Sequence, residues 1–248
     1  MKEALETTPE PAAMLDAAPV ARAAAPPFLP FPDKRDRAYR PSYQWGGETL
    51  SERHRRICDA VWHVPGWLSE EDALKLYELA YFCDGPILEI GTFCGRSAAV
   101  MGLALADRGS DVPFVTVDPD ASILALAQRS LRSLHVEDRV VMVCDTVDDF
   151  LRAAPDFRPR LVFVDADHSA EGVRADLAAL HSNVDPGTLL LFHDYLRGDV
   201  PDTTGFPVSA EPIEVAAAVD DSWVARHAAF AGTFGWCGLF CVETAPAA

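Results

Sequence analysis

The stretch from Ile87 to Ser97 constrains the fold more than any other part of this chain. It joins a short apolar strand pattern, interrupted by Glu89, to a turn that holds Gly91 and Gly95 and then to a helix-favouring run. Glycines let the backbone approach a ligand closely at such junctions, where doubly wound sheets bind nucleosides. The spacing lacks the Gly-x-Gly-x-x-Gly pattern that cradles a dinucleotide pyrophosphate. A nucleoside without phosphates is therefore the expected ligand.

Four more apolar segments follow at regular intervals, at residues 114–117, 140–143, 161–164 and 189–192, with helical patterns between them. This alternation predicts right-handed βαβ units and a mostly parallel sheet, which is an α/β fold. The runs 224–231 and 238–243 predict a closing hairpin. Before the first strand, Ser69 with Asp72 three residues later indicates a capped helix, with Ala73, Leu76, Tyr77 and Ala80 on its apolar face.

Residues 1–44 are rich in alanine and proline and show no periodic apolar face, so we expect a disordered or loosely attached arm. Residues 45–248 then form one domain. Residues 57–248 carry 12 Lys and Arg against 30 Asp and Glu. Such an acidic domain repels nucleic-acid phosphates and anionic lipid, which argues against a nucleic-acid or membrane partner and favours a small molecule.

The six cysteines include no Cys-x-x-Cys pair and mostly fall in apolar runs, as reduced core thiols do. No apolar run is long enough to span a bilayer, and the amino terminus lacks the apolar region of a signal peptide. We therefore expect a cytoplasmic protein. The sequence is compatible with a homo-oligomer but does not specify one.

The junction at residues 87–97 resembles motif I of the class I S-adenosylmethionine (SAM) methyltransferases, and its residues are similar to those of the same motif in catechol O-methyltransferase. The resemblance extends over roughly residues 60 to 243. It implies a Rossmann-like, doubly wound sheet of seven mostly parallel strands that ends in an antiparallel hairpin. It also implies SAM as the cofactor. The SAM-binding residues that it implies are Glu89, Gly91, Thr92, Phe93, Gly95, Ser97, Asp118, Asp145, Thr146 and Asp165.

Three of these acids have competing structural interpretations. Asp118 ends the second strand, where the family binds the SAM ribose, but it could instead cap the next helix near Asp120. Asp145 ends the third strand, where the family contacts adenine, and it too could cap a helix. Glu89 needs a partner, because an unpaired carboxylate in a buried strand costs several kcal/mol. A hydrogen bond that orders the glycine loop would give Glu89 such a partner, and so would a contact with the cofactor.

Asp165, His193 and Asp194 follow two strands that should be neighbours, so their side chains could meet on one divalent cation. The arrangement resembles the metal-dependent catechol enzymes and, more specifically, the macrocin O-methyltransferase-like enzymes that methylate sugar hydroxyls. Carboxylates suit Mg²⁺, and the imidazole would also accept Mn²⁺, Fe²⁺ or Zn²⁺. In those families the fifth strand usually ends in Asp-Asn or Asp-Asp. A histidine at position 193 therefore leaves both the identity and the presence of the metal undecided. The alternative is a metal-free site in which His193 and Asp194 bind each other and Asp165 contacts the SAM amine.

His168 stands three residues after Asp165, where the catechol enzymes have a catalytic lysine. An imidazole with a pKa near 6.5 is suited to take a proton from a hydroxyl, so we expect His168 and Asp165 to be the catalytic pair. His168 could instead be an inert residue beside the helix cap at Ser169.

The resulting hypothesis is SAM-dependent methylation of an oxygen on a small hydroxylated molecule, such as a sugar or a catechol-like natural product. Acceptor recognition is expected from Tyr43 and Trp45, from Tyr195, and from the loop 197–212. A metal-free N- or C-methyltransferase and a non-catalytic SAM-binding protein remain as alternatives.

Overall fold

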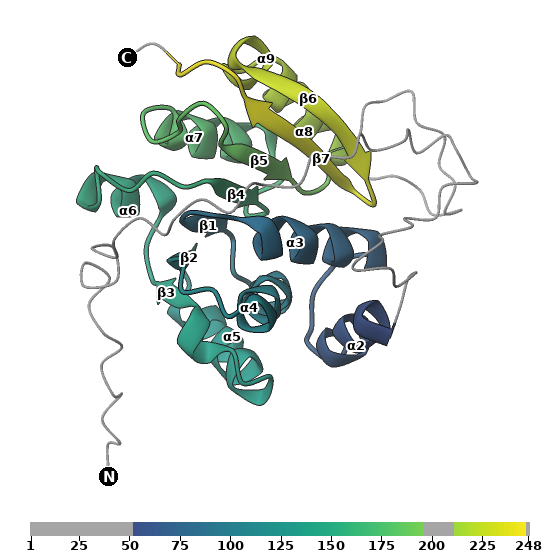
Figure 1. Cartoon of the computed structure of the whole chain (residues 1–248). Coiled ribbons are helices and arrows are strands. Elements are labelled where there is room, and N and C mark those ends of the chain that lie inside the picture. Colours follow the sequence, from purple (N-terminus) through teal and green to yellow (C-terminus); the bar gives the residue numbers. More distant parts are fainter. Residues whose placement is uncertain (1–51, 196–210, 247–248) are drawn as a thin grey trace.

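The computed structural model describes residues 52–195 and 211–246. A seven-stranded sheet in the order β3-β2-β1-β4-β5-β7-β6 runs through its centre, with helices on both faces (Figure 1). In chain order the elements are α2 (Glu52–Val61), α3 (Glu70–Phe82), β1 (Ile87–Ile90), α4 (Arg96–Arg108), β2 (Phe114–Val117), α5 (Ala121–Ser133), a 3₁₀ turn (Glu137–Arg139), β3 (Val141–Val143), α6 (Val147–Ala153), β4 (Leu161–Val164), α7 (Ala170–Leu180), β5 (Leu189–Phe192), α8 (Glu211–Asp220), α9 (Val224–His227), β6 (Ala228–Phe234) and β7 (Cys237–Val242).

Strands β1 to β5 pair in parallel, and β7 joins β5 in the antiparallel sense. The chain runs from β1 outward to β3 and then returns to place β4 on the other side of β1. The sheet therefore reverses its winding between β1 and β4, and this is where open α/β sheets bind ligands. The predicted fold class, a mostly parallel sheet closed by an antiparallel hairpin, is confirmed.

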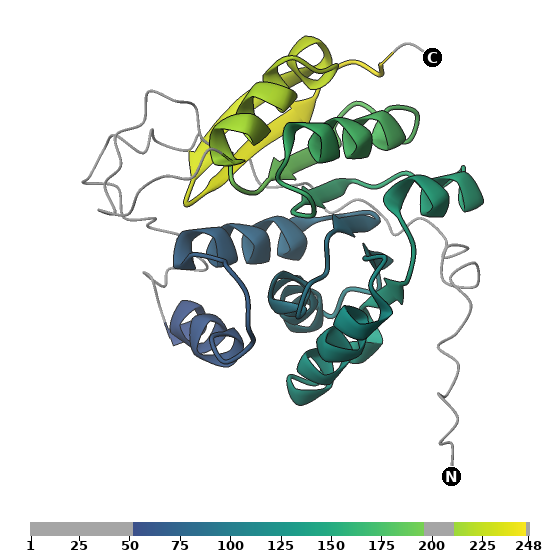
Figure 2. The same cartoon turned by 180° about the vertical axis from the view of Figure 1, so that it is seen from behind.

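Two apolar cores flank the sheet, one on each face. Helices α3 and α4 supply much of the first core, while α6, α7 and α8 supply much of the second. Figure 2 shows α7 and α8 packed together beside the hairpin. Side chains of β1 alternate between the cores, with Ile87 in the first and Leu88 and Ile90 in the second. Glu89 therefore points to the α4 side of the sheet.

The predicted helix cap is present. The Ser69 hydroxyl accepts a hydrogen bond from the Asp72 amide, and the Asp72 carboxylate accepts one from the Ser69 amide. The four residues expected on the apolar face of α3 are all fully buried. All six cysteines lie in the described part of the chain, and they form no disulfides with one another, as the sequence predicts.

Several boundaries differ from the predictions, namely those of β3 and of both hairpin strands, which run over Ala228–Phe234 and Cys237–Val242. Strand β3 begins at Val141, one residue later than expected. At the carboxyl end, residues 224–227 form the helical turn α9 and the hairpin strand starts only at Ala228. The reason is Trp223, which is buried and donates its indole N–H to the Leu177 carbonyl, so the backbone after it is held against α7 in a helical turn.

The predicted arm at residues 1–44, with Tyr43, and also Trp45 lie outside the described residues, as does most of the predicted loop 197–212. Within the ranges 52–195 and 211–246, no helix has the length and apolar character needed to cross a membrane.

Candidate active site

The glycine turn after β1 is held against the end of β4. Gly91 has a φ of +93°, and a Cβ atom on it would lie 2.3 Å from the Asp165 carbonyl oxygen. Phe93 also has a positive φ, of +43°. Gly95 begins α4 with a φ of +82°. The turn therefore depends on left-handed backbone and on a missing side chain, as the sequence predicted.

Asp118 fixes this turn from the neighbouring strand. Its Oδ2 accepts hydrogen bonds from the amides of Thr92 and Phe93 at 3.2 and 3.1 Å. Helix α5 is capped instead by Asp120, whose carboxylate accepts from the amides of Ser122 and Ile123. The capping interpretation thus belongs to Asp120, while Asp118 orders the loop at the mouth of the site.

A cavity of about 620 Å³ opens over the carboxyl ends of β1 to β4. Its lining includes six aspartates, Asp118, Asp145, Asp148, Asp165, Asp167 and Asp176. Thr146 also lines the cavity, but its hydroxyl caps α6 by accepting from the Asp149 amide, so Asp145 is not the cap. Such a dense set of carboxylates favours a cationic ligand and disfavours a polyphosphate.

Glu89 lies beneath the turn and is completely buried, and neither of its carboxylate oxygens has a hydrogen-bond partner among the described residues. Burial raises its pKa to about 8, although the nearby hydroxyls of Ser97 and Thr116 act in the opposite direction. At neutral pH the Glu89 side chain is therefore mostly a neutral acid that can donate a proton to a hydrogen bond.

A smaller cavity of about 170 Å³ adjoins the first and shares Gly91, Phe93 and Asp165 with it. Ser97, His168 and His193 also line it. At its rim the ring of Trp67, which is 83% exposed, lies 5.8 Å from that of Phe93. The carboxylate and imidazole groups that line this cavity therefore lie next to the exposed aromatic surface of Trp67 and Phe93.

Asp165, His168, His193 and Asp194, here called the four-residue cluster, form an alternating ring of acids and imidazoles. His168 places Nε2 at 3.2 Å from Asp165 Oδ1 and Nδ1 at 3.0 Å from Asp194 Oδ2. His193 Nδ1 lies 3.2 and 3.4 Å from the same two oxygens. Asp194 adopts a φ of +52°, a strained conformation for a residue other than glycine. The structure thus brings together all four residues that the sequence assigned to metal binding and catalysis.

Mutual contacts set the protonation of this cluster. Hydrogen bonds to Asp165 and then to Asp194 raise the pKa of His168 to about 10. Burial lowers the pKa of His193, but the carboxylates, Asp165 foremost, outweigh it and raise the pKa well above its usual value. Burial would raise the pKa of both acids, yet the imidazoles hold each below its ordinary value. The predicted pKa near 6.5 for His168 is thus wrong without a bound cation, because two carboxylates stabilise its charged form.

The sequence-based role of Tyr195 in acceptor recognition is not supported. Its ring is fully buried between the sheet and the hairpin, and its hydroxyl donates to Asp220 Oδ1 at 2.9 Å. Two residues that sequence reasoning left out of the site lie beside His193, namely Asp72 and Cys237. Asp72 carried only a helix-capping signal, and Cys237 only that of a core thiol, so no local pattern could have revealed their position.

The decisive comparison concerns the stretch from β1 to the end of β5. Residues 88–195 match the family model described as a methyltransferase domain. This stretch of the chain is similar to methyltransferase domains. The matched span contains the glycine turn, Asp118 and the whole four-residue cluster.

Solved structures share the same fold. The chain is similar to the SAH-bound Podospora anserina methyltransferase PaMTH1, with 16% identity and a TM-score of 0.59 over 77% of this chain and 88% of that one. It is also similar to the Bacillus cereus O-methyltransferase in complex with SAH, with 18% identity and a TM-score of 0.55 over 77% and 90%. A third similar structure is TomG of Streptomyces achromogenes, an O-methyltransferase involved in tomaymycin synthesis and solved with SAM. The identity is 24% and the TM-score is 0.54, over 78% of this chain and 90% of that one. These likenesses show that the fold is shared, and the family match supports the predicted SAM-dependent methyltransferase.

Proposed function

We propose that this methyltransferase transfers the SAM methyl group to an oxygen of a small hydroxylated molecule, such as a sugar or a catechol-like compound, with the help of a divalent cation. The observation that carries the proposal is the position of the four-residue cluster. Three of its members, Asp165, His168 and His193, line the smaller cavity, and Asp165 also lines the larger, acidic one. A methyl donor in one cavity and an acceptor in the other would meet beside the cluster.

The larger cavity suits the donor. SAM carries a sulfonium and an amine, and an aspartate-rich lining favours both cations. We assign the ribose hydroxyls to Asp118, the adenine to Asp145 with Thr146, and the methionine portion to the turn at Gly91–Gly95, with Glu89 and Ser97 beneath it. The protein's main contribution is then orientation, since in-line displacement at a methyl group needs the acceptor oxygen directly opposite the sulfur.

The four-residue cluster fits a divalent cation. Nδ1 of His193 is buried and lies 3.2 Å from Asp165 Oδ1, yet it has no hydrogen bond among the described residues. Ligand atoms that each lie about 2.1 Å from one metal ion are about 3 Å from one another. Two polar atoms at this spacing without a hydrogen bond between them are therefore expected where both bind the same ion. Asp165, His193 and Asp194 would hold the ion, and the mixed donors suit Mn²⁺ or Fe²⁺ as well as Mg²⁺. When bound, such a cation supplies Lewis acidity that lowers the pKa of an acceptor hydroxyl.

His168 is the proposed proton acceptor. It faces the smaller cavity and touches both carboxylates of the cluster. Its raised pKa comes from those two carboxylates, so any engagement of Asp165 and Asp194 by a positive charge removes the cause and returns the imidazole toward its ordinary pKa. His168 would then take the acceptor proton at a ring nitrogen that such engagement frees from its carboxylate partner.

The test is the formation of S-adenosylhomocysteine by the full chain from SAM with catechols and vicinal sugar diols as acceptors. We expect Asp165→Asn and Asp194→Ala each to abolish turnover without loss of the fold by circular dichroism. The matched control is Asp148→Asn, which changes a carboxylate of the larger cavity that pairs with Arg152. Unimpaired turnover in EDTA would refute the role of the cation, and full activity of Asp165→Asn would refute the site.

One observation favours a metal-free alternative. The two imidazoles of the cluster already neutralise its two carboxylates when all four groups are charged. A metal-free N- or C-methyltransferase would be indifferent to EDTA and would use acceptors without vicinal oxygens. A non-catalytic SAM-binding protein would bind SAM in calorimetry and yield no S-adenosylhomocysteine with any acceptor.

A further inference from the structure

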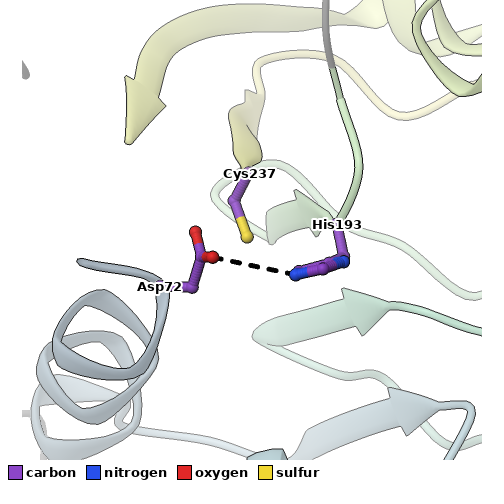
Figure 3. Close-up of side chains that lie close together, drawn as sticks. All are labelled: Asp72, His193 and Cys237. Atoms are coloured by element: carbon purple, nitrogen blue, oxygen red, sulfur yellow. Dashed lines mark ion pairs between the residues drawn. The ribbon is translucent and has the colours of Figure 1, made fainter. Parts of the chain in front are cut away.

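The His193 imidazole stands between two sets of acidic groups. On one side, Nδ1 faces Asp165 and Asp194 in the four-residue cluster. On the other side, Nε2 faces Asp72 Oδ2 at 3.7 Å, with the Cys237 thiol close to both (Figure 3). Asp72 and Cys237 are completely buried and His193 is 4% exposed. A buried ring nitrogen without a hydrogen bond therefore points directly at a buried carboxylate.

Asp72 is held rigidly in this position. Its Oδ2 accepts from the Ser69 amide at 3.1 Å, and its Oδ1 accepts from the Trp236 amide at 2.8 Å. Gly235 leaves room for it, since a Cβ atom there would lie 2.0 Å from Asp72 Oδ1. The carboxylate thus joins the start of α3 to the turn between β6 and β7. Neither hydrogen bond requires Asp72 to face His193, so the contact is an additional feature of the site.

Such a contact has a defined effect on a metal-binding imidazole. A carboxylate next to one ring nitrogen favours a proton on that nitrogen and leaves the lone pair on the other, which fixes the tautomer and orientation of the ring. The distance of 3.7 Å exceeds the hydrogen-bond range by about 0.5 Å, a gap that a small rotation of the ring closes. The lone pair of Nδ1 would then point at the space between Asp165 and Asp194.

We propose that Asp72 is a positioning residue for the cation site and acts entirely through His193. The inference rests on the cation of the proposed function. Asp72 holds the proton on Nε2, so that Nδ1 is available as a ligand. Cys237 packs beside the pair and does not bind the ion.

The experiment measures Mn²⁺ affinity of the full chain, from the electron paramagnetic resonance signal of free Mn²⁺, with no substrate present. Asp72→Asn keeps the size of the side chain but removes the negative charge that favours a proton on Nε2, so Nδ1 is no longer held free as a ligand. We expect Mn²⁺ binding to weaken about 10- to 100-fold. The matched control is Ser69→Ala, which removes the hydroxyl that caps α3 but leaves the Asp72 carboxylate, and should leave the affinity within about twofold.

The outcomes separate the two proposals. A wild-type protein that binds no Mn²⁺ refutes the cation of the proposed function and this inference with it. Tight wild-type binding that Asp72→Asn leaves unchanged, or that Ser69→Ala weakens equally, overturns the positioning role alone. A cobalt–thiolate charge-transfer band in the Co²⁺-loaded protein that disappears in Cys237→Ser would put the ion on the Nε2 side and also overturn it.

A measurement on the unmutated chain guards against a variant that does not fold. Two-bond ¹H–¹⁵N spectra of the Mg²⁺-loaded protein report which nitrogen of His193 carries the proton. Protonated Nε2 and bare Nδ1 support the inference, and the opposite tautomer refutes it.

Discussion

Replacing Gly91 with alanine measures what the contact between the glycine turn and the end of β4 contributes to the protein. A Cβ atom at this position would lie 2.3 Å from the Asp165 carbonyl oxygen and 2.8 Å from Ala166 Cα. Both are backbone atoms of a central strand end, so they cannot move aside cheaply. Left-handed backbone costs a non-glycine residue about 1–2 kcal/mol, and the overlap adds about 1–3 kcal/mol. We expect Gly91→Ala to lower the free energy of unfolding by about 2–5 kcal/mol.

Gly109→Ala is the matched control. Gly109 also has a positive φ, of +66°, but no atom lies within 4 Å of the Cβ position. Its substitution should therefore cost only the backbone strain of about 1–2 kcal/mol. Urea unfolding followed by circular dichroism gives both values, and calorimetry gives SAM affinity, which only Gly91→Ala should weaken. Equal destabilisation by the two variants would refute the reasoning, because the contact with β4 would then cost nothing.

Three further outcomes test individual side chains. Asp118→Ala leaves two loop amides without an acceptor and should abolish measurable SAM binding in calorimetry; unchanged affinity would contradict this. Burial, and then the charge of Asp167, raise the pKa of Asp176 to about 7, so the folded chain holds this proton more tightly and stability falls as pH rises from about 4 to 7. Asp176→Asn should remove up to about 3 kcal/mol of that fall in urea titrations at pH 5 and pH 8, and parallel curves would argue against it. Burial lowers the pKa of Lys75 to about 8, although the Glu78 carboxylate acts in the opposite direction. The free energy of unfolding should therefore rise between pH 8 and 10.5, and Lys75→Met should abolish this rise.

The fold was predictable because its signals are local. Each parallel strand is a short apolar run, and β1, β2 and β4 are each followed directly by a glycine or an aspartate. The segment 224–227 was misassigned because a distant contact, from the Trp223 indole to the Leu177 carbonyl, decides its conformation. Apolar pattern alone could not distinguish a strand there from a helical turn.

The site was predictable in part, for a related reason. Parallel strands end side by side, so Asp165, His193 and Asp194 could be placed together from their positions alone. The two ion pairs of His168, and hence its raised pKa, depend on side-chain directions that the sequence does not encode locally. Asp72 was recognised only as a capping acid, because its second partner, Trp236, lies 164 residues away along the chain.

The hairpin at the carboxyl end also sets the order in which the molecule can be assembled. Strand β7 pairs with β5, and the Trp236 carbonyl accepts a hydrogen bond from the amide of Tyr195, directly after Asp194. A growing chain on the ribosome has all of β1, β2 and β3 long before residue 236 emerges. The donor-binding half can therefore take shape early, while His193 and Asp194 gain their final support only once the hairpin has been made.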